Sequence, residues 1–153
     1  MHSVKRTLVG LVCAGVAVVG VASAETQHYT GHHCVPKTGG SVDYGAYGIE
    51  CDSTQYLFCP IVKMAGGSTY TTIDIVTSSG VSQSEVMLFE STWEGDLARS
   101  TPAESTATEG RGKRHHWANY TPLEGDNILV IRVQGQPNDD VYSYRLDDTG
   151  VDY

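Results

Sequence analysis

The chain is a succession of short runs of β-branched and aromatic residues separated by turn residues, and this pattern constrains its fold most strongly. Along Asn127–Gln134 (NILVIRVQ), Leu129, Ile131 and Val133 alternate with other residues. Thr69–Thr77 (TYTTIDIVT) places its two isoleucines on one face in the same way. Alternation with a period of two is typical of a strand with one buried face, and no segment shows the sustained period of 3.6 that indicates a helix.

Several further segments meet the same criteria. Thr101–Gly112 does not: it is polar and weakly patterned, and we expect a long exposed loop or a frayed edge. Within Val141–Leu146, alternation predicts that Tyr142, Tyr144 and Leu146 share one face. Seven to nine short antiparallel strands at this spacing predict one all-β domain, a jelly-roll-like β-sandwich. The other predicted strands are Gln27–Val35, Tyr44–Cys51, Gln55–Val62, Ser84–Glu90, Arg114–Tyr120 and Val141–Leu146.

The first 24 residues have the composition of a secretory signal peptide. Lys5 and Arg6 precede Thr7–Val21, a run without charge, and Ala22-Ser23-Ala24 forms a small-x-small cleavage site. The apolar run is short for a membrane span, although a retained membrane anchor is the alternative. The sequence thus predicts a secreted or periplasmic protein whose β-sandwich domain covers residues 25–153, without membrane insertion after cleavage.

Charge excludes some partners of this domain. Without Lys5 and Arg6 the domain keeps 8 basic residues against 18 acidic ones, a formal charge of −10. Such a domain repels the phosphate backbone of nucleic acids and anionic membrane surfaces. We therefore expect an extracellular or cell-surface ligand and no nucleic-acid partner.

Three cysteines follow the predicted cleavage site: Cys34, Cys51 and Cys59. An oxidising compartment favours one disulfide and one remaining thiol, and three pairings are possible. We favour Cys34–Cys59, because a loop of 25 residues would gain roughly 3 kcal/mol in the chain-entropy model. Cys51 would then be a free, buried thiol, with an intermolecular bridge or a reactive nucleophile as the alternatives.

Two adjacent histidine pairs, His32-His33 and His115-His116, raise the possibility of a metal site. If both pairs lie on strands, neighbouring side chains point to opposite faces and cannot share one ion. His28 and His32 would share a face but lie about 13 Å apart, too far for direct chelation. We expect no metal and no cofactor. Calcium stays open, because the turns are rich in carboxylates, although none has the EF-hand register.

No motif for catalysis is present: the chain lacks a G-x-S-x-G elbow, H-E-x-x-H, a phosphate-binding glycine loop and S-x-x-K. A dispersed site of Ser, His and Asp remains possible. Aromatic residues are the better candidates for binding, since Tyr and Trp stack on sugars and suit protein interfaces. The candidate binding residues are Trp93, Trp117 and Tyr120, because they lie near predicted loops.

Two parts of the chain carry resemblances. Gly31-His32-His33-Cys34, Tyr44 with Gly48-Ile49, and Cys59-Pro60-Ile61 resemble the pattern G-x-x-C, Y-x-x-x-G, C-P-I of short secreted bacterial proteins of unknown function. Residues 86–101 and 123–148 resemble bacterial pre-peptidase C-terminal-type sandwich modules. These resemblances fit a Cys34–Cys59 bridge and imply an exported, non-catalytic accessory or binding module, with no functional residue to carry over.

The expected function is therefore non-catalytic binding of a carbohydrate or a protein outside the cytoplasm. The alternatives are a small secreted hydrolase with a dispersed site and a structural envelope or matrix protein.

Overall fold

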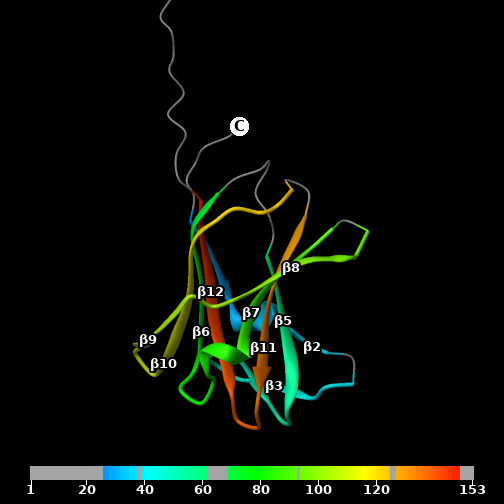
Figure 1. Cartoon of the computed structure of the whole chain (residues 1–153). Helices are drawn as coiled ribbons and strands as arrows, with labels where there is room; N and C mark the ends of the chain where they lie inside the picture. The colour runs from blue at the N-terminus through cyan, green and yellow to red at the C-terminus, as the bar shows by residue number, and fades with distance from the viewer. Residues whose placement is uncertain (1–25, 38, 62–68, 93, 125–126, 149–153) are drawn as a thin grey trace, which may run out of the picture.

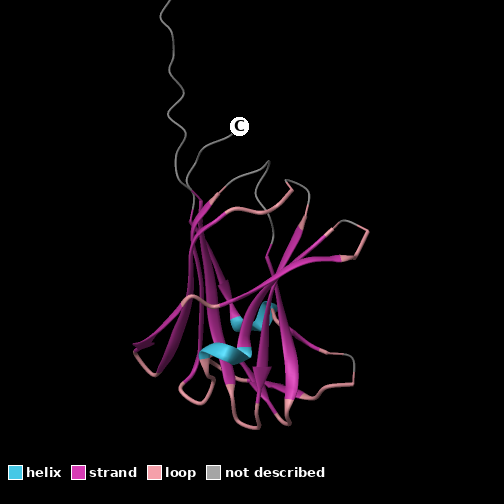
Figure 2. Ribbon diagram, in the orientation of Figure 1, coloured by secondary structure: helices cyan, strands magenta, loops and turns pink. Residues whose placement is uncertain are grey.

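A computed structural model describes residues 26–37, 39–61, 69–92, 94–124 and 127–148. The predicted signal peptide and Trp93 lie outside this part of the chain. The described residues form two antiparallel sheets packed face to face (Figures 1 and 2), which confirms the all-β sandwich, with twelve strands rather than seven to nine. The elements are β1 (Thr26–Thr30), the 3-10 turn η1 (Gly31–His33), β2 (Val35–Pro36), β3 (Val42–Tyr44), β4 (Ile49–Cys51), β5 (Gln55–Ile61), β6 (Tyr70–Ser78), the 3-10 turn η2 (Gln83–Glu85), β7 (Val86–Ser91), β8 (Leu97–Pro102), β9 (Ser105–Glu109), β10 (Gly112–Tyr120), β11 (Ile128–Gly135) and β12 (Asp140–Asp148).

The strand order is that of a jelly roll. Sheet A has seven strands in the order β3-β4-β12-β6-β10-β9, with β1 also paired to β12, and sheet B has five in the order β2-β5-β11-β7-β8. Numbering β4, β5, β6, β7, β8, β10, β11 and β12 from one to eight gives the orders 1-8-3-6 and 2-7-4-5. The chain therefore crosses between the sheets at most connections, as in a double Greek key.

The core lies between the sheets and follows the predicted alternation. Leu129, Ile131 and Val133 of β11 are buried, whereas Arg132 between them points outward. From sheet A, Ile73 and Ile75 are both fully buried. Strands buried on one face and open on the other leave two outer faces, and the side chains on these faces decide what the sandwich can bind.

Two predicted strands are interrupted. Gln27–Val35 is divided by η1, where a Cβ at Gly31 would lie 1.8 Å from the Val141 carbonyl oxygen, so only glycine can pack there. The chain turns at this point from β1 in sheet A to β2 in sheet B. Tyr44–Cys51 is likewise divided, into β3 and β4, by a short loop that the Gly45 N–H closes by donating to the Gly48 carbonyl at 3.0 Å.

A β-bulge in β12 changes which residues face the core. Val141 pairs with Thr77 but Ser143 pairs with Val76, so Tyr142 is the extra residue of the bulge. Val141, Tyr144 and Leu146 are buried, whereas Tyr142 is only half-buried. The prediction that Tyr142 shares the face of Tyr144 is therefore wrong, because a bulge re-aims the side chain that it carries.

Thr101–Gly112 is not a loop. The segment contains the end of β8, all of β9 and the start of β10; β8 is one edge strand of sheet B and β9 is one edge strand of sheet A. Most side chains of β9 are exposed, which explains why the sequence lacks an apolar alternation there. Of the two expectations for this segment, the long loop is wrong, and the frayed edge is closer to the observed edge strands.

Candidate functional site

The outer face of sheet B carries an unusual set of side chains. The chain has only two phenylalanines, Phe58 and Phe89, and both point outward from this sheet. Arg132 lies between them, with its guanidinium 4.7 Å from the ring centroids of Tyr56 and Phe89. Its Nη2 also lies 3.0 Å from the Met87 sulfur. We call this surface the aromatic face; its central members are Tyr56, Phe58, Met87, Phe89, Val130 and Arg132.

Exposed aliphatic residues form the rim of the aromatic face. Val35 on β2 is 52% exposed, Leu97 on β8 is 60% exposed and Ile128 at the start of β11 is 49% exposed. A hollow of about 370 Å³ lies among Leu97, Arg132 and the central rings, with Lys37 at its border. The face thus joins exposed apolar surface to a shallow concavity.

Charge is unevenly distributed between the two sheets. In the described strands of sheet B, Glu90 is the single acidic residue, and it is fully buried on the inner side. The outward charges are those of Arg132 and, beside Tyr56, Lys37, whose ammonium lies 5.9 Å from the ring centroid. In a chain with 18 acidic residues, the described part of this face therefore carries cations but no carboxylate.

Tyr120 and Trp117, two of the predicted binding residues, lie in the interior. Trp117 is fully buried and donates its indole N–H to the Thr101 carbonyl at 3.2 Å. Tyr120 is 6% exposed and donates its hydroxyl to Glu90 Oε2 at 2.9 Å; burial and this hydrogen bond raise its pKa to about 12. The expectation that they lie exposed beside loops is wrong: both residues belong to β10, as the predicted strand Arg114–Tyr120 has it, but both side chains point into the sandwich. Trp93, the third candidate, lies outside the described residues.

Glu90 is the centre of a buried polar cluster. Its Oε1 accepts hydrogen bonds from the Leu123 N–H and the Asn127 amide, at 2.5 and 2.7 Å. Its Oε2 accepts from Tyr120 and from two nitrogens of Arg99. Burial raises the pKa of Glu90, but these hydrogen bonds outweigh it and leave the pKa below its usual value. The cluster fixes the chain after β10 against β7 and leaves no group free for a ligand.

The two histidine pairs do not come together at one site. His32 and His33 lie on η1 rather than on a strand, so the strand argument does not apply to this pair. His115 and His116 do lie on a strand and point to opposite faces as predicted: His115 is fully buried, and His116 bonds Asp74 on the outside at 2.7 Å. In the part of the chain that the structure describes, no three His, Cys, Asp or Glu side chains are placed to hold a metal ion.

A polar row crosses the outer face of sheet A and includes the residue types of a hydrolase. Ser105, His116 and Asp74 are cross-strand neighbours on β9, β10 and β6. Asp74 also accepts from Arg145 Nη2 at 2.5 Å, which pairs its carboxylate with a cation on the neighbouring strand β12. Between the described residues Ser105 and His116 there is no hydrogen bond, so a nucleophile and its base are not coupled here. The row is a cross-strand hydrogen bond between His116 and Asp74, and Arg145 forms the ion pair with Asp74.

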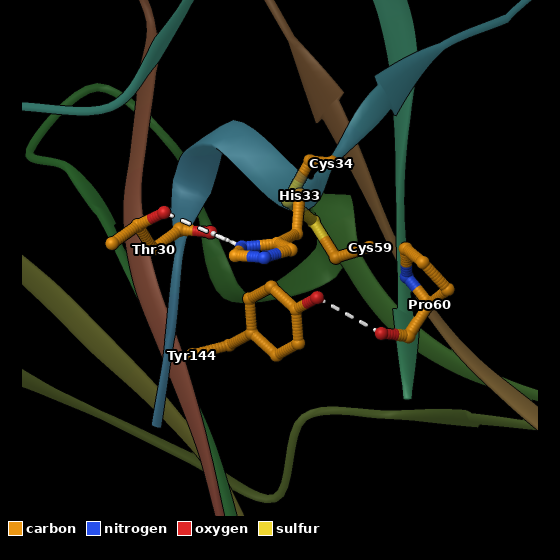
Figure 3. The surroundings of a disulfide bond; sticks show 6 residues. All are labelled: Thr30, His33, Cys34, Cys59, Pro60 and Tyr144. Carbon is orange, nitrogen blue, oxygen red and sulfur yellow. Dashed lines mark hydrogen bonds between the residues drawn. A yellow bond between two sulfur atoms is a disulfide. The ribbon is translucent and has the colours of Figure 1, made fainter. Parts of the chain in front are cut away.

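Figure 3 shows the disulfide that joins Cys34, after η1, to Cys59 on β5, which confirms the favoured pairing. The nearby Tyr144 hydroxyl donates to the Pro60 carbonyl at 2.9 Å and so connects β12 of sheet A with β5 of sheet B. Cys51 is a free, buried cysteine. Burial, and next the nearby Asp139 carboxylate, raises the pKa of its thiol to about 11, which opposes reactivity.

Comparison with known protein families, with characterised proteins and with solved structures gives no match for this chain. The two resemblances expected from the sequence therefore stay predictions. Within the described residues, no helix has the length and apolar character of a transmembrane span.

The sequence contains a pattern that predicts the aromatic face, but a search limited to aromatic residues near loops misses it. Val86–Glu90 is almost entirely apolar, and a strand in a sandwich with one open face places every second side chain outside. If Val86 and Leu88 face the core, Met87 and Phe89 must face solvent, as they do. The order of strands in the sheet decides which strands lie beside β7. The sequence alone therefore does not show that Phe58 and Arg132 complete the face.

Proposed function

We propose that this protein is an exported, non-catalytic accessory module that binds a partner protein through the aromatic face. The observation that carries the proposal is that both phenylalanines and Tyr56 surround an outward Arg132 on a sheet with no outward carboxylate in its described strands. Protein interfaces are enriched in aromatic residues, Met and Arg and depleted of Asp and Glu at their centres. Export rests on the predicted signal peptide, and the disulfide fits an oxidising compartment.

Stacking of a saccharide on the same face is the second candidate, since Lys37, Arg132 and Gln134 would supply hydrogen-bond donors beside the rings. However, the guanidinium of Arg132 already lies over both Tyr56 and Phe89. A sugar would have to displace it, whereas an apolar protein side chain can pack against Val35, Leu97 and the ring edges around it. The geometry therefore favours a protein.

Self-association through this face is disfavoured. Two copies that met through their aromatic faces would bring Arg132 and Lys37 of each copy near the same cations of the other. Like charges opposed across an interface cost binding energy. The structural or matrix alternative thus finds no support from this surface.

The test uses two substitutions that add a carboxylate to the rim, Val35→Asp and Leu97→Asp. Both side chains are more than half exposed, so the fold should tolerate the change. Affinity capture from the extracytoplasmic fraction of the source cells, followed by identification of the retained protein, supplies a purified partner for calorimetric titration. We expect each substitution to weaken this binding at least tenfold, because it opposes apolar contact with a charge.

Leu123→Asp is the matched control, since Leu123 is 59% exposed but lies outside the aromatic face. It should bind the partner as the unaltered protein does. If the rim variants bind the partner unchanged, or if a panel of oligosaccharides binds instead and Tyr56→Ala abolishes that binding, the protein-binding proposal is wrong.

A further inference from the structure

A second surface, at one end of sheet A, has the opposite chemistry. A groove of about 420 Å³ lies where three distant segments meet. They are the Gly45–Gly48 loop between β3 and β4, the turn between β9 and β10 around Arg111, and the start of β12 with Asp140 and Tyr142. None of these residues belongs to the aromatic face, so the two surfaces are independent.

The fold builds this groove from close backbone contacts. A Cβ at Gly112 would lie 1.9 Å from the Thr77 carbonyl oxygen, so only glycine allows the β9–β10 turn to approach β6. On the other side, His32 Nε2 donates to the Gly45 carbonyl at 2.8 Å and ties the β3–β4 loop to η1. The bulge in β12 turns Tyr142 from the core toward this side.

Three carboxylates stand in one cross-strand row beside the groove. Asp43 on β3 is the direct partner of Glu50 on β4, and Glu50 is the direct partner of Asp140 on β12. Side chains that oppose each other in antiparallel strands have Cβ atoms about 5 Å apart, and like charges at such positions destabilise the sheet. None of the three forms an ion pair with a described residue. The free protein therefore holds an excess of negative charge here, with Arg111 as a cation that lines the same groove.

Two tyrosines and one arginine complete the site. Tyr47 is 73% exposed, and the Arg111 guanidinium lies 5.5 Å from its ring centroid. Tyr142 donates its hydroxyl to Asp140 at 3.3 Å. The remaining lining carboxylate, Glu109, already pairs with Arg114 at 3.1 Å. The contact between Arg111 and Tyr47 demonstrates that this ring accepts a planar cation on its face.

We infer that this groove binds a guanidinium or ammonium group, as on an arginine or lysine side chain of a basic peptide. The cation lies against the Tyr47 ring and donates hydrogen bonds to Glu50 and Asp140, and so relieves their mutual repulsion. A chain with a formal charge of −8 also attracts cationic ligands from a distance. A metal ion fits less well, because no three carboxylates of the described residues converge on a point.

The test titrates acetyl-Gly-Arg-Gly-amide into the full domain and follows the ring signals of Tyr47 and Tyr142 by NMR. The matched ligand contains citrulline, which has the shape of arginine without its charge. We expect saturable shifts with the arginine peptide and with its lysine analogue, and none with the citrulline peptide. Raising the salt concentration from 50 to 500 mM should weaken binding severalfold, as screening requires.

Variants locate the site. Tyr47→Ala and Glu50→Gln should each weaken binding of the arginine peptide at least fivefold, whereas Glu94→Gln, an exposed carboxylate outside the groove, should leave it unchanged. Arg111→Ala should strengthen binding, because it removes the competing guanidinium. Without peptide, Glu50→Gln should raise the melting temperature by about 1–3 °C, since one repulsive pair is lost.

Equal binding of the arginine and citrulline peptides would overturn the inference. So would affinities that are unchanged in Tyr47→Ala and Glu50→Gln, or tyrosine shifts that calcium produces and the peptides do not. The peptide titration does not involve the aromatic face. Its outcome therefore does not decide the proposed function, which the rim variants test separately.

Discussion

His115 shows how a single residue makes the stability of this fold depend on pH. Its ring is fully buried, with Nε2 3.0 Å from the Thr77 hydroxyl and Nδ1 3.1 Å from the Thr106 hydroxyl. Because Thr77 donates its own proton to the Ser78 carbonyl, the ring proton lies on Nε2. Burial, aided by the Lys113 charge and opposed by Glu85, lowers the pKa of His115 to about 4. The fold thus keeps this imidazole neutral.

Acid should therefore destabilise the protein as the pH falls between the pKa of His115 in the unfolded chain and its pKa in the folded chain. The unfolded chain binds a proton at His115 below about pH 6.5 and the folded chain only below about pH 4. The stabilisation is fully present above pH 6.5 and is lost as the pH falls to 4, by about 3 kcal/mol at most. Urea unfolding between pH 7.5 and 4 measures this change. His115→Gln should flatten the profile between pH 6.5 and 5, whereas His33→Gln, at an exposed site, should not; equal slopes for both variants would contradict the assignment.

At the scale of elements, the turn between β9 and β10 contains two glycines that resist substitution for different physical reasons. Gly112 has no room for a Cβ, because the Thr77 carbonyl lies in its path, whereas Gly110 has open space but a φ of +57°. Substitution at Gly112 must move β10 away from β6, the strand with which β10 forms its longer ladder. Substitution at Gly110 only strains the backbone.

We expect Gly112→Ala to destabilise the domain by several kcal/mol and Gly110→Ala by about 1 kcal/mol. Thermal unfolding of the two variants, side by side, measures the difference. A cost for Gly112→Ala no larger than that for Gly110→Ala would mean that the contact between β10 and β6 adjusts without loss.

At the scale of the whole molecule, the three cysteines of the described residues have two roles: two form a disulfide and one is a buried thiol. The Cys34–Cys59 disulfide closes a loop of 25 residues, and its removal in the double variant Cys34→Ala/Cys59→Ala should cost about 2–5 kcal/mol of unfolding free energy, which urea unfolding of the variant measures.

The buried Cys51 thiol, with a pKa near 11, should not react with a thiol reagent such as DTNB until the protein unfolds. Labelling with and without urea tests this, and rapid labelling of the native protein would show that Cys51 is accessible.

Much of the fold was predictable because alternation is a local property. The buried positions of β11 and the isoleucines of β6 follow from their neighbours in sequence, and loop length favoured the right cysteine pair. Other features depend on distant contacts. The predicted strand Gln27–Val35 is interrupted at Gly31, where the chain passes from sheet A to sheet B and where Val141, far along the chain, leaves no room for a Cβ. Tyr142 left its predicted face because the register of β12 against β6 shifts at that residue.

The candidate sites were less predictable than the fold for the same reason. Trp117 and Tyr120 resembled exposed residues because they lie near predicted loops, yet both side chains point into the sandwich. The carboxylate row requires that β3, β4 and β12 be neighbours, although their members lie nearly a hundred residues apart in sequence. Only sheet order brings such charges together.

The pairing of β1 with β12 fixes how the molecule would be displayed on a support. Thr26 lies opposite Asp147, so both ends of the described chain leave from one pole of the sandwich, and β12 begins at the other pole with Asp140 (Figure 1). At about 3.3 Å per residue, β12 places these poles roughly 25 Å apart. A label attached at Thr26 would therefore lie at the pole opposite Asp140 and leave Tyr47 and its neighbours, which share a groove with Asp140, accessible at the other pole.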